Sequence, residues 1–153
     1  MNGTIVCAVT DSEGADAAVR VAARLAERFG SRVVLVNVAE SFGVVGQEGG
    51  FTTARAQEGA RRLIERLASD HDLAGRGEGR VEIGPPIETL AAVAAEEAAE
   101  LIVVGARRGL RRRTLQSKIA RELAATAVCP VVVAPPENAL GSPGSPRPLA
   151  LGA

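Results

Sequence analysis

Short, unbroken runs of apolar and β-branched residues recur along this chain, and they constrain its fold more than any other feature. They predict strands at 4–9 (TIVCAV), 32–38 (RVVLVNV), 101–105 (LIVVG) and 130–134 (PVVVA). Strands that are buried on both faces have this continuous pattern, which is typical of parallel sheets. The run at 80–83 (RVEI) alternates instead, and this predicts an edge strand that is exposed on one side.

Segments with helical periodicity separate these runs. The spacing of their apolar residues predicts helices at 13–29, 54–69 and 87–99, and a fourth helix that opens near Ser117. Pro86 suits the first turn of the third helix, where a missing N–H does no harm. Strands that alternate with helices predict a doubly wound α/β sheet with helices on both faces.

Three segments lack a stable period. The segment 39–53 holds four glycines and two phenylalanines and is predicted to be a loop, while 70–79, with three glycines, is predicted to be a linker. The last residues, 136–153, are rich in Pro, Gly and Ser and predict a disordered tail. We therefore expect one folded domain at 1–135, followed by this tail.

Composition restricts the class of protein. The formal net charge is zero, so no overall field favours nucleic acid or a membrane surface. No apolar run approaches the roughly 20 residues of a membrane span, and the N-terminus lacks the pattern of a signal peptide. Cys7, inside a predicted strand, and Cys129 show neither metal spacing nor a disulfide framework, so both are expected to be reduced and packed. These features predict a cytoplasmic protein.

Positive charge is concentrated in the loop that follows the fourth strand. Five arginines fall within seven positions there: Arg107, Arg108, Arg111, Arg112 and Arg113. A strand, a loop carrying glycine and arginine, and a helix start place backbone N–H donors, a helix dipole and guanidinium groups together. The arrangement suits a phosphate group, and the alternative is a solvated arginine face.

Strand order indicates where a ligand would lie. In doubly wound sheets, ligands bind outside the carboxyl ends of the strands, where the strand order reverses. If the first strand neighbours the fourth, Thr10, Asp11 and Ser12 lie against Gly105 and the arginine loop. Both lines of reasoning indicate the same crevice.

No pattern predicts catalysis or a metal site. His71 lies in the glycine-rich linker and is expected to be exposed and solvated, because no nucleophile accompanies it. Glu88, Glu96 and Glu97 are expected on the exposed side of the third helix and indicate no pair of catalytic carboxylates. We therefore predict no catalytic residues and no metal ligands.

Over residues 3–134 the chain resembles the universal stress protein family. The resemblance rests on VTDSEGADAAVRVAARLA, LVNVAE, LIVVGARRG and, most specifically, SKIARELAATAVCPVVVAPP. It implies a five-stranded parallel sheet of order 3-2-1-4-5 with a Rossmann-like arrangement, and usually a homodimer paired through the last strand. It also implies that the crevice is an ATP site in many members, whereas other members bind no nucleotide.

The nucleotide motif of the family is altered here. Nucleotide-binding members carry a glycine, two residues, a glycine, nine residues, and a glycine followed by Ser or Thr. Gly105 matches the first glycine and Ser117 the final hydroxyl residue. Arg108 and Gln116 replace the other two glycines, Gly109 falls one place late, and the loop is two residues shorter than in the motif. Backbone donors lose access to phosphate at such positions. The neighbouring arginines, Arg107 among them, could replace these donors by bidentate hydrogen bonds.

Two further positions carry the resemblance into the crevice. The family's acid after the first strand aligns with Thr10 if no gap is allowed, and with Asp11 if one is. Val38 matches the position whose backbone meets adenine. The implied ligand-binding residues are therefore Thr10, Asp11, Val38, Gly105, Arg107, Arg108, Gly109, Gln116 and Ser117.

Two hypotheses about function follow. The first is a cytosolic stress-response regulatory module that binds ATP or a related nucleotide without significant catalysis, with magnesium only alongside the nucleotide. The alternative is a family member that binds no nucleotide and acts by dimerisation and through protein partners. No general base or acid pair supports an enzyme, which leaves only a weak ATPase activity open. Missing stacking aromatics disfavour nucleic acid.

Overall fold

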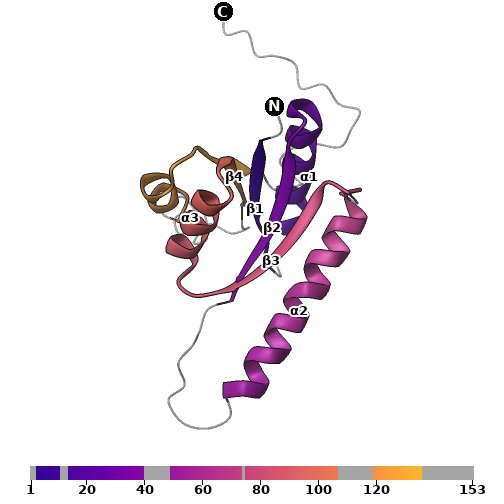
Figure 1. Ribbon diagram of the computed structural model, residues 1–153, viewed down its shortest axis with the longest axis vertical. Coiled ribbons are helices and arrows are strands. Elements are labelled where there is room, and N and C mark those ends of the chain that lie inside the picture. The colour runs from indigo at the N-terminus through magenta and orange to yellow at the C-terminus, as the bar shows by residue number, and fades with distance from the viewer. Residues whose placement is uncertain (1–2, 11–13, 40–48, 74, 107–118, 136–153) are drawn as a thin grey trace, which may run out of the picture.

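The computed structural model describes residues 3–10, 14–39, 49–73, 75–106 and 119–135. Within them a parallel sheet of five strands has the order β3-β2-β1-β4-β5 (Figure 1). The strands are β1 (Thr4–Ala8), β2 (Arg32–Ala39), β3 (Gly77–Ile83), β4 (Ala99–Gly105) and β5 (Val131–Ala134). The predicted fold class and strand order are therefore confirmed, and β3 is an edge strand as expected.

Helices cover both faces of the sheet. The helices α1 (Gly14–Phe29) and α2 (Gly49–Asp70) pack on one face, and α3 (Pro86–Glu96) and a helical segment at 119–126 pack on the other. Figure 1 shows α2 and α3 on opposite sides of the sheet, with α2 running beside β3. Pro86 occupies the first turn of α3, as predicted. The tail predicted at 136–153 lies outside the described residues.

The core consists of two layers, one on each face of the sheet. Ile5, Leu35 and Leu67 are fully buried in the layer beneath α1 and α2. Ile102 and Leu123 are fully buried in the layer beneath α3 and the segment 119–126. Each buried side chain of this size contributes about 1.5–3 kcal/mol. Consecutive residues of β1 and of the middle of β2 are buried on both faces of the sheet, which explains why these sequences show no alternation.

The last three residues of the glycine-rich segment 70–79, which we expected to be a linker, form the beginning of β3. The strand begins at Gly77, although 80–83 was predicted. A Cβ atom on Gly79 would lie 2.5 Å from Cγ2 of Ile64, and one on Gly77 would lie 3.0 Å from Cβ of Leu73. The glycines therefore permit α2 and its C-terminal turn to lie directly against the edge strand.

Two other boundaries differ from the predictions. The second helix begins at Gly49, inside the segment 39–53 that was predicted to be a loop, and residues 40–48 lie outside the described part. The third helix ends at Glu96, short of the predicted 99, because Ala98 takes a positive φ of 49° and β4 follows at once. The end of this helix was not predictable, because the alanine-rich sequence shows no change from apolar to polar residues at the turn.

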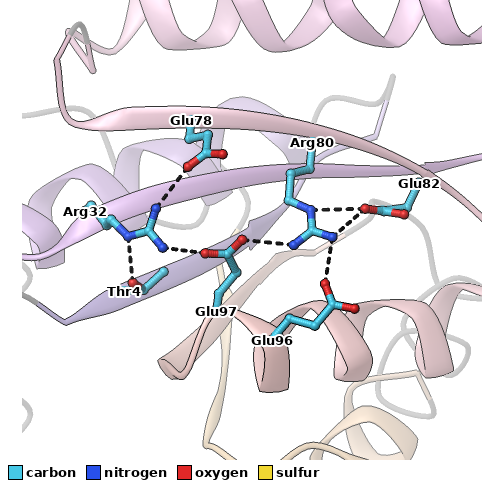
Figure 2. A network of polar contacts seen from close by, with 7 residues as sticks. All are labelled: Thr4, Arg32, Glu78, Arg80, Glu82, Glu96 and Glu97. Carbon is cyan, nitrogen blue, oxygen red and sulfur yellow. Dashed lines mark hydrogen bonds and ion pairs between the residues drawn. The ribbon is translucent and has the colours of Figure 1, made fainter.

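Edge strand β3 is tied to the end of α3 by ion pairs centred on Arg80 (Figure 2). The Arg80 guanidinium lies 2.7 Å from Glu82, 2.8 Å from Glu96 and 2.9 Å from Glu97. Hydrogen bonds, first that of Glu96 and then that of Glu82, raise the pKa of Arg80 further. The guanidinium therefore stays charged and bridges the sheet to the helix.

Glu97 extends the same network to β2. Its second carboxylate oxygen accepts a hydrogen bond from Arg32, which also donates to Glu78 at 2.9 Å and to the Thr4 hydroxyl at 3.0 Å (Figure 2). The Glu97 side chain is only 14% exposed, so the prediction that it faces solvent is wrong. Glu88 is exposed as expected. The four clustered carboxylates pair with two arginines, and the network joins β2, β3 and the end of α3.

The prediction for His71 is also wrong. Its side chain is 12% exposed, and its Nε2 atom lies 3.0 Å from Oδ1 of Asp16 in the first turn of α1. Arg66 lies 3.9 Å from the same carboxylate oxygen. His71 therefore joins the end of α2 to the beginning of α1, a contact between residues that lie far apart in the sequence.

Candidate functional site

Strands β1 and β4 lie side by side at the centre of the sheet, with Cys7 opposite Val103. The order reverses here, because β2 follows on one side of β1 and β4 lies on the other. Val9 and Thr10 follow β1, and Gly105 ends β4, so both segments leave the sheet at its carboxyl edge. This edge is where ligands bind in open α/β sheets.

The start of α1 touches the end of β4 through its backbone. A Cβ atom on Gly105 would lie 2.4 Å from the carbonyl oxygen of Gly14, and one on Gly14 would lie 2.7 Å from the carbonyl oxygen of Ala106. Both distances are too short for any side chain. Gly105 therefore has a packing role here, in addition to the ligand role that its family position implies.

A cavity of about 430 Å³ opens at this edge, on the α3 side of the sheet. It draws residues from β1, β2, β4, β5, α1, α3 and the segment 119–126, namely Ala8, Val9, Thr10, Gly14, Ala15, Val36, Val38, Pro86, Leu90, Val104, Gly105, Ile119, Ala120 and Val133. Its volume lies within the range of small-molecule sites, roughly 300–1,000 Å³.

The described wall of the cavity is apolar, with one polar side chain and one helix start. Thr10 supplies the polar side chain and is exposed at the carboxyl end of β1. Gly14 and Ala15 belong to the first turn of α1, whose backbone N–H groups lack partners within the helix. The partial positive charge of a helix N-terminus favours an anion. The crevice therefore combines a surface for a flat apolar group with donors for a charged one.

The structure brings together three of the residues that the sequence indicated. Thr10, Val38 and Gly105 line the same cavity, although they come from three different strand ends. The other candidate residues, Asp11, Arg107, Arg108, Gly109, Gln116 and Ser117, lie outside the described residues.

Sequence reasoning missed the far wall of the crevice. Pro86 and Leu90 of α3, and Ile119 and Ala120 of the later helix, line the cavity opposite the sheet. The signal that could have revealed them is positional. The Pro85–Pro86 pair follows β3, so α3 starts at the same carboxyl edge as the crevice.

Neither cysteine suits covalent chemistry. Burial raises the pKa of the Cys7 thiol to about 12, and it also raises that of Cys129. A thiol that stays protonated is a poor nucleophile. In the residues that the structure describes, no group of His, Cys, Asp or Glu side chains could hold a metal ion. None of the described helices has the length and apolar content to cross a membrane.

The reversed strand order, the cavity at the reversal and the helices on both faces define a doubly wound α/β protein with a cavity at its switch point. The chain belongs to the universal stress protein family, whose family model matches residues 1–135. Among the curated proteins compared with it, none matches.

Solved structures of the same family resemble it closely in fold. A protein of the universal stress protein family from Burkholderia pseudomallei is 26% identical, with 86% of this chain and 94% of that one covered and a TM-score of 0.70. The universal stress protein from Archaeoglobus fulgidus in complex with dAMP is 21% identical, with 87% and 97% covered and a TM-score of 0.61. A family protein from Arabidopsis thaliana with AMP bound is 16% identical, with 93% and 97% covered and a TM-score of 0.65.

Proposed function

We propose that this protein is a cytosolic stress-response regulatory module that binds ATP or a related adenine nucleotide in the β1/β4 crevice, without significant catalysis. The observation that carries the proposal is the cavity of about 430 Å³ at the reversal of strand order. Two similar proteins, one from Archaeoglobus fulgidus and one from Arabidopsis thaliana, are described as bound to dAMP and AMP.

Each part of the nucleotide has a matching part of the crevice. Val36, Val38 and Leu90 offer apolar surface to the base. We propose that the backbone of Val38 forms hydrogen bonds with the edge of its ring. The Thr10 hydroxyl suits the sugar or the base, and the first turn of α1 suits a phosphate. We propose that Asp11, Arg107, Arg108, Gly109, Gln116 and Ser117 complete the site. Magnesium would accompany the nucleotide rather than bind by itself.

The chemical character of the wall supports binding without catalysis. The described lining residues include no ionisable side chain. A general base would have to lie within hydrogen-bond reach of the attacking group. The described part of the crevice can therefore hold and orient a nucleotide, but it offers no group to take up a proton.

A second role, self-association through β5, is favoured by a separate observation. β5 is an edge strand with one neighbour, β4. Around it Val128, Val133 and Ile119 are 75%, 45% and 42% exposed. An apolar edge of this kind is suited to pairing with a second copy. A dimer without a nucleotide would correspond to the alternative in which the protein acts by dimerisation and through partners.

Thermal unfolding with and without millimolar ATP or AMP tests the nucleotide proposal. A ligand present at 100 times its Kd stabilises a protein by about 2.7 kcal/mol, which raises the Tm of a chain of this size by roughly 5–10 °C. We expect such a rise for the wild-type protein.

A pair of matched variants assigns the effect to the crevice. Ala8→Leu adds three carbon atoms to the wall of the cavity, whereas Ala92→Leu makes the same change on the exposed side of α3. The nucleotide should raise the Tm of Ala92→Leu as it does for the wild type, and that of Ala8→Leu much less. No rise in the wild type, or an equal rise in both variants, would contradict the proposal.

A further inference from the structure

Asn37 is a polar residue within the otherwise apolar run of β2. Its neighbours Val33 to Val36 are buried, and Asn37 itself is half-buried. Its side-chain Nδ2 donates a hydrogen bond of 3.0 Å to the carbonyl oxygen of Val9, directly after β1. Asn37 therefore acts on the chain segment that carries Thr10 into the crevice.

This hydrogen bond stands at the point where the β1–β2 ladder stops. The ladder begins with a bond from the Arg32 N–H to the Gly3 carbonyl, and the Val9 N–H donates to the Val36 carbonyl at 2.9 Å. A regular parallel ladder would continue with a bond from the Val38 N–H to the Val9 carbonyl. That bond is not among the backbone hydrogen bonds that the described residues make. The Val9 carbonyl accepts a hydrogen bond from the Asn37 amide instead.

The side chains of Val38 and Asn37 lie on opposite faces of the sheet. Val38 lines the β1/β4 crevice. Asn37, one position earlier on the strand, lines a separate cavity of about 440 Å³ beneath α2, with Ala60 and Leu63. The amide of Asn37 therefore reaches the Val9 carbonyl from behind the crevice wall, without occupying any of the space that a ligand needs.

We propose that Asn37 is a positioning residue for the crevice, which holds the Val9 carbonyl and so keeps the Val38 N–H out of the ladder and available to a ligand. A backbone donor in an apolar wall requires an acceptor. The ring nitrogen of a heteroaromatic base is an acceptor that lies at the edge of a flat ring, where the Val38 N–H could donate to it. This inference rests on the proposed function and names a residue, outside the cavity, on which base binding depends.

Two variants separate this role from a merely structural one. Asn37→Leu removes the amide and leaves the Val9 carbonyl to accept from the Val38 N–H, so the ladder gains one bond while the ligand loses one. The Kd for AMP, measured by calorimetry, should rise about threefold to tenfold, and the Tm without AMP should not fall. Asn37→Gln keeps the donor, and its longer side chain has room in the cavity beneath α2, so its Kd should stay within about twofold of the wild type.

Amide hydrogen exchange in the ligand-free protein, followed by NMR, tests the same inference without a nucleotide. The Val38 amide should exchange much faster than that of Val36, which lies within the ladder, and Asn37→Leu should slow it. A Val38 amide that is as protected as Val36 in the wild type would overturn the inference. So would an Asn37→Leu variant whose Tm falls while its AMP affinity is unchanged. If the wild type binds no AMP, the proposed function fails, and the exchange comparison alone decides the role of Asn37.

Discussion

At the scale of single residues, the crevice depends on two glycines whose backbones meet. Gly14 starts α1 and Gly105 ends β4, and a side chain on either would collide with a carbonyl oxygen of the other segment. The sequence indicated Gly105 as the first glycine of a nucleotide motif. Its packing role could not be predicted, because Gly14 carries no sign in the sequence that it will meet Gly105.

Gly105→Ala should therefore destabilise the protein. The new Cβ would lie 2.4 Å from the Gly14 carbonyl oxygen, so α1 and β4 must separate. We expect a loss of about 1–3 kcal/mol in the free energy of unfolding, measured with urea. The control is Gly59→Ala in α2, where no atom lies within 4 Å of the new Cβ. This change should stabilise by up to about 1 kcal/mol, and equal effects of the two substitutions would contradict the assigned contact.

Cys7 makes stability depend on alkaline pH. In the folded protein, burial raises the pKa of its thiol from the ordinary value of 9.0 to about 12. Below pH 9 both states hold the proton, and the thiol adds no pH dependence. Above pH 9 the unfolded chain loses the proton while the folded protein keeps it. Stability should therefore fall by about 1.4 kcal/mol per pH unit until the folded thiol also ionises.

Urea unfolding of the wild type and Cys7→Ala between pH 8 and 11 measures this effect. The sequence contains no tyrosine, so a common source of alkaline titration is missing. The wild type should lose stability more steeply than Cys7→Ala, whatever the difference between them at pH 8. Parallel slopes would show that Cys7 is not protonated and buried as described.

At the scale of elements, the helices and buried strands were predictable, and their contacts were not. The runs of β1, β2, β4 and β5 are short and rich in β-branched residues, and these two features favour buried strands over helices. The predicted range for β3 was too short, because Gly77 and Gly79 are typical of a linker. Nothing in the sequence indicates that α2 packs against these glycines. The contact of His71 with Asp16, and that of Arg80 with Glu97, join residues that no local pattern relates.

The network between β2, β3 and α3 should depend most on Glu97. This carboxylate accepts from both Arg32 and Arg80, and its side chain is 14% exposed. Glu97→Gln removes the charge and leaves two guanidinium groups facing a neutral amide. We expect a loss of about 1–2 kcal/mol in the free energy of unfolding.

Glu58→Gln is the matched control. Glu58 pairs with Arg62 on the surface of α2, where the two side chains are 63% and 76% exposed. Exposed pairs of this kind contribute little, so the change should cost less than about 0.5 kcal/mol. If Glu97→Gln costs no more than its control, β3 does not depend on the network.

At the scale of the whole molecule, the position of the crevice was predictable and its walls were not. The strand pattern and the arginine loop placed a site between Thr10 and Gly105, because parallel strands present their carboxyl ends at one edge. The apolar wall formed by Pro86 and Leu90 depends on how α3 lies over the sheet, which no local pattern in the sequence specifies.

Self-association through β5 is a prediction at the same scale. Val133→Glu places a charge on the exposed edge of β5, where Val133 is 45% exposed. The mass measured by light scattering during size exclusion should correspond to a dimer for the wild type and fall to a monomer for this variant. Ile83→Glu is the control, because Ile83 is similarly exposed, at 43%, at the end of β3. A monomeric wild type, or dissociation caused by Ile83→Glu alone, would contradict pairing through β5.

The most direct measurement is a crystal structure of the protein grown with AMP or ATP. The account predicts electron density for the base between Val38 and Leu90, with its ring edge at the Val38 N–H and its phosphates towards the start of α1. Two results would contradict it: a crevice that holds no nucleotide in crystals grown at a saturating concentration of AMP or ATP, or a nucleotide bound on the α2 side of the sheet.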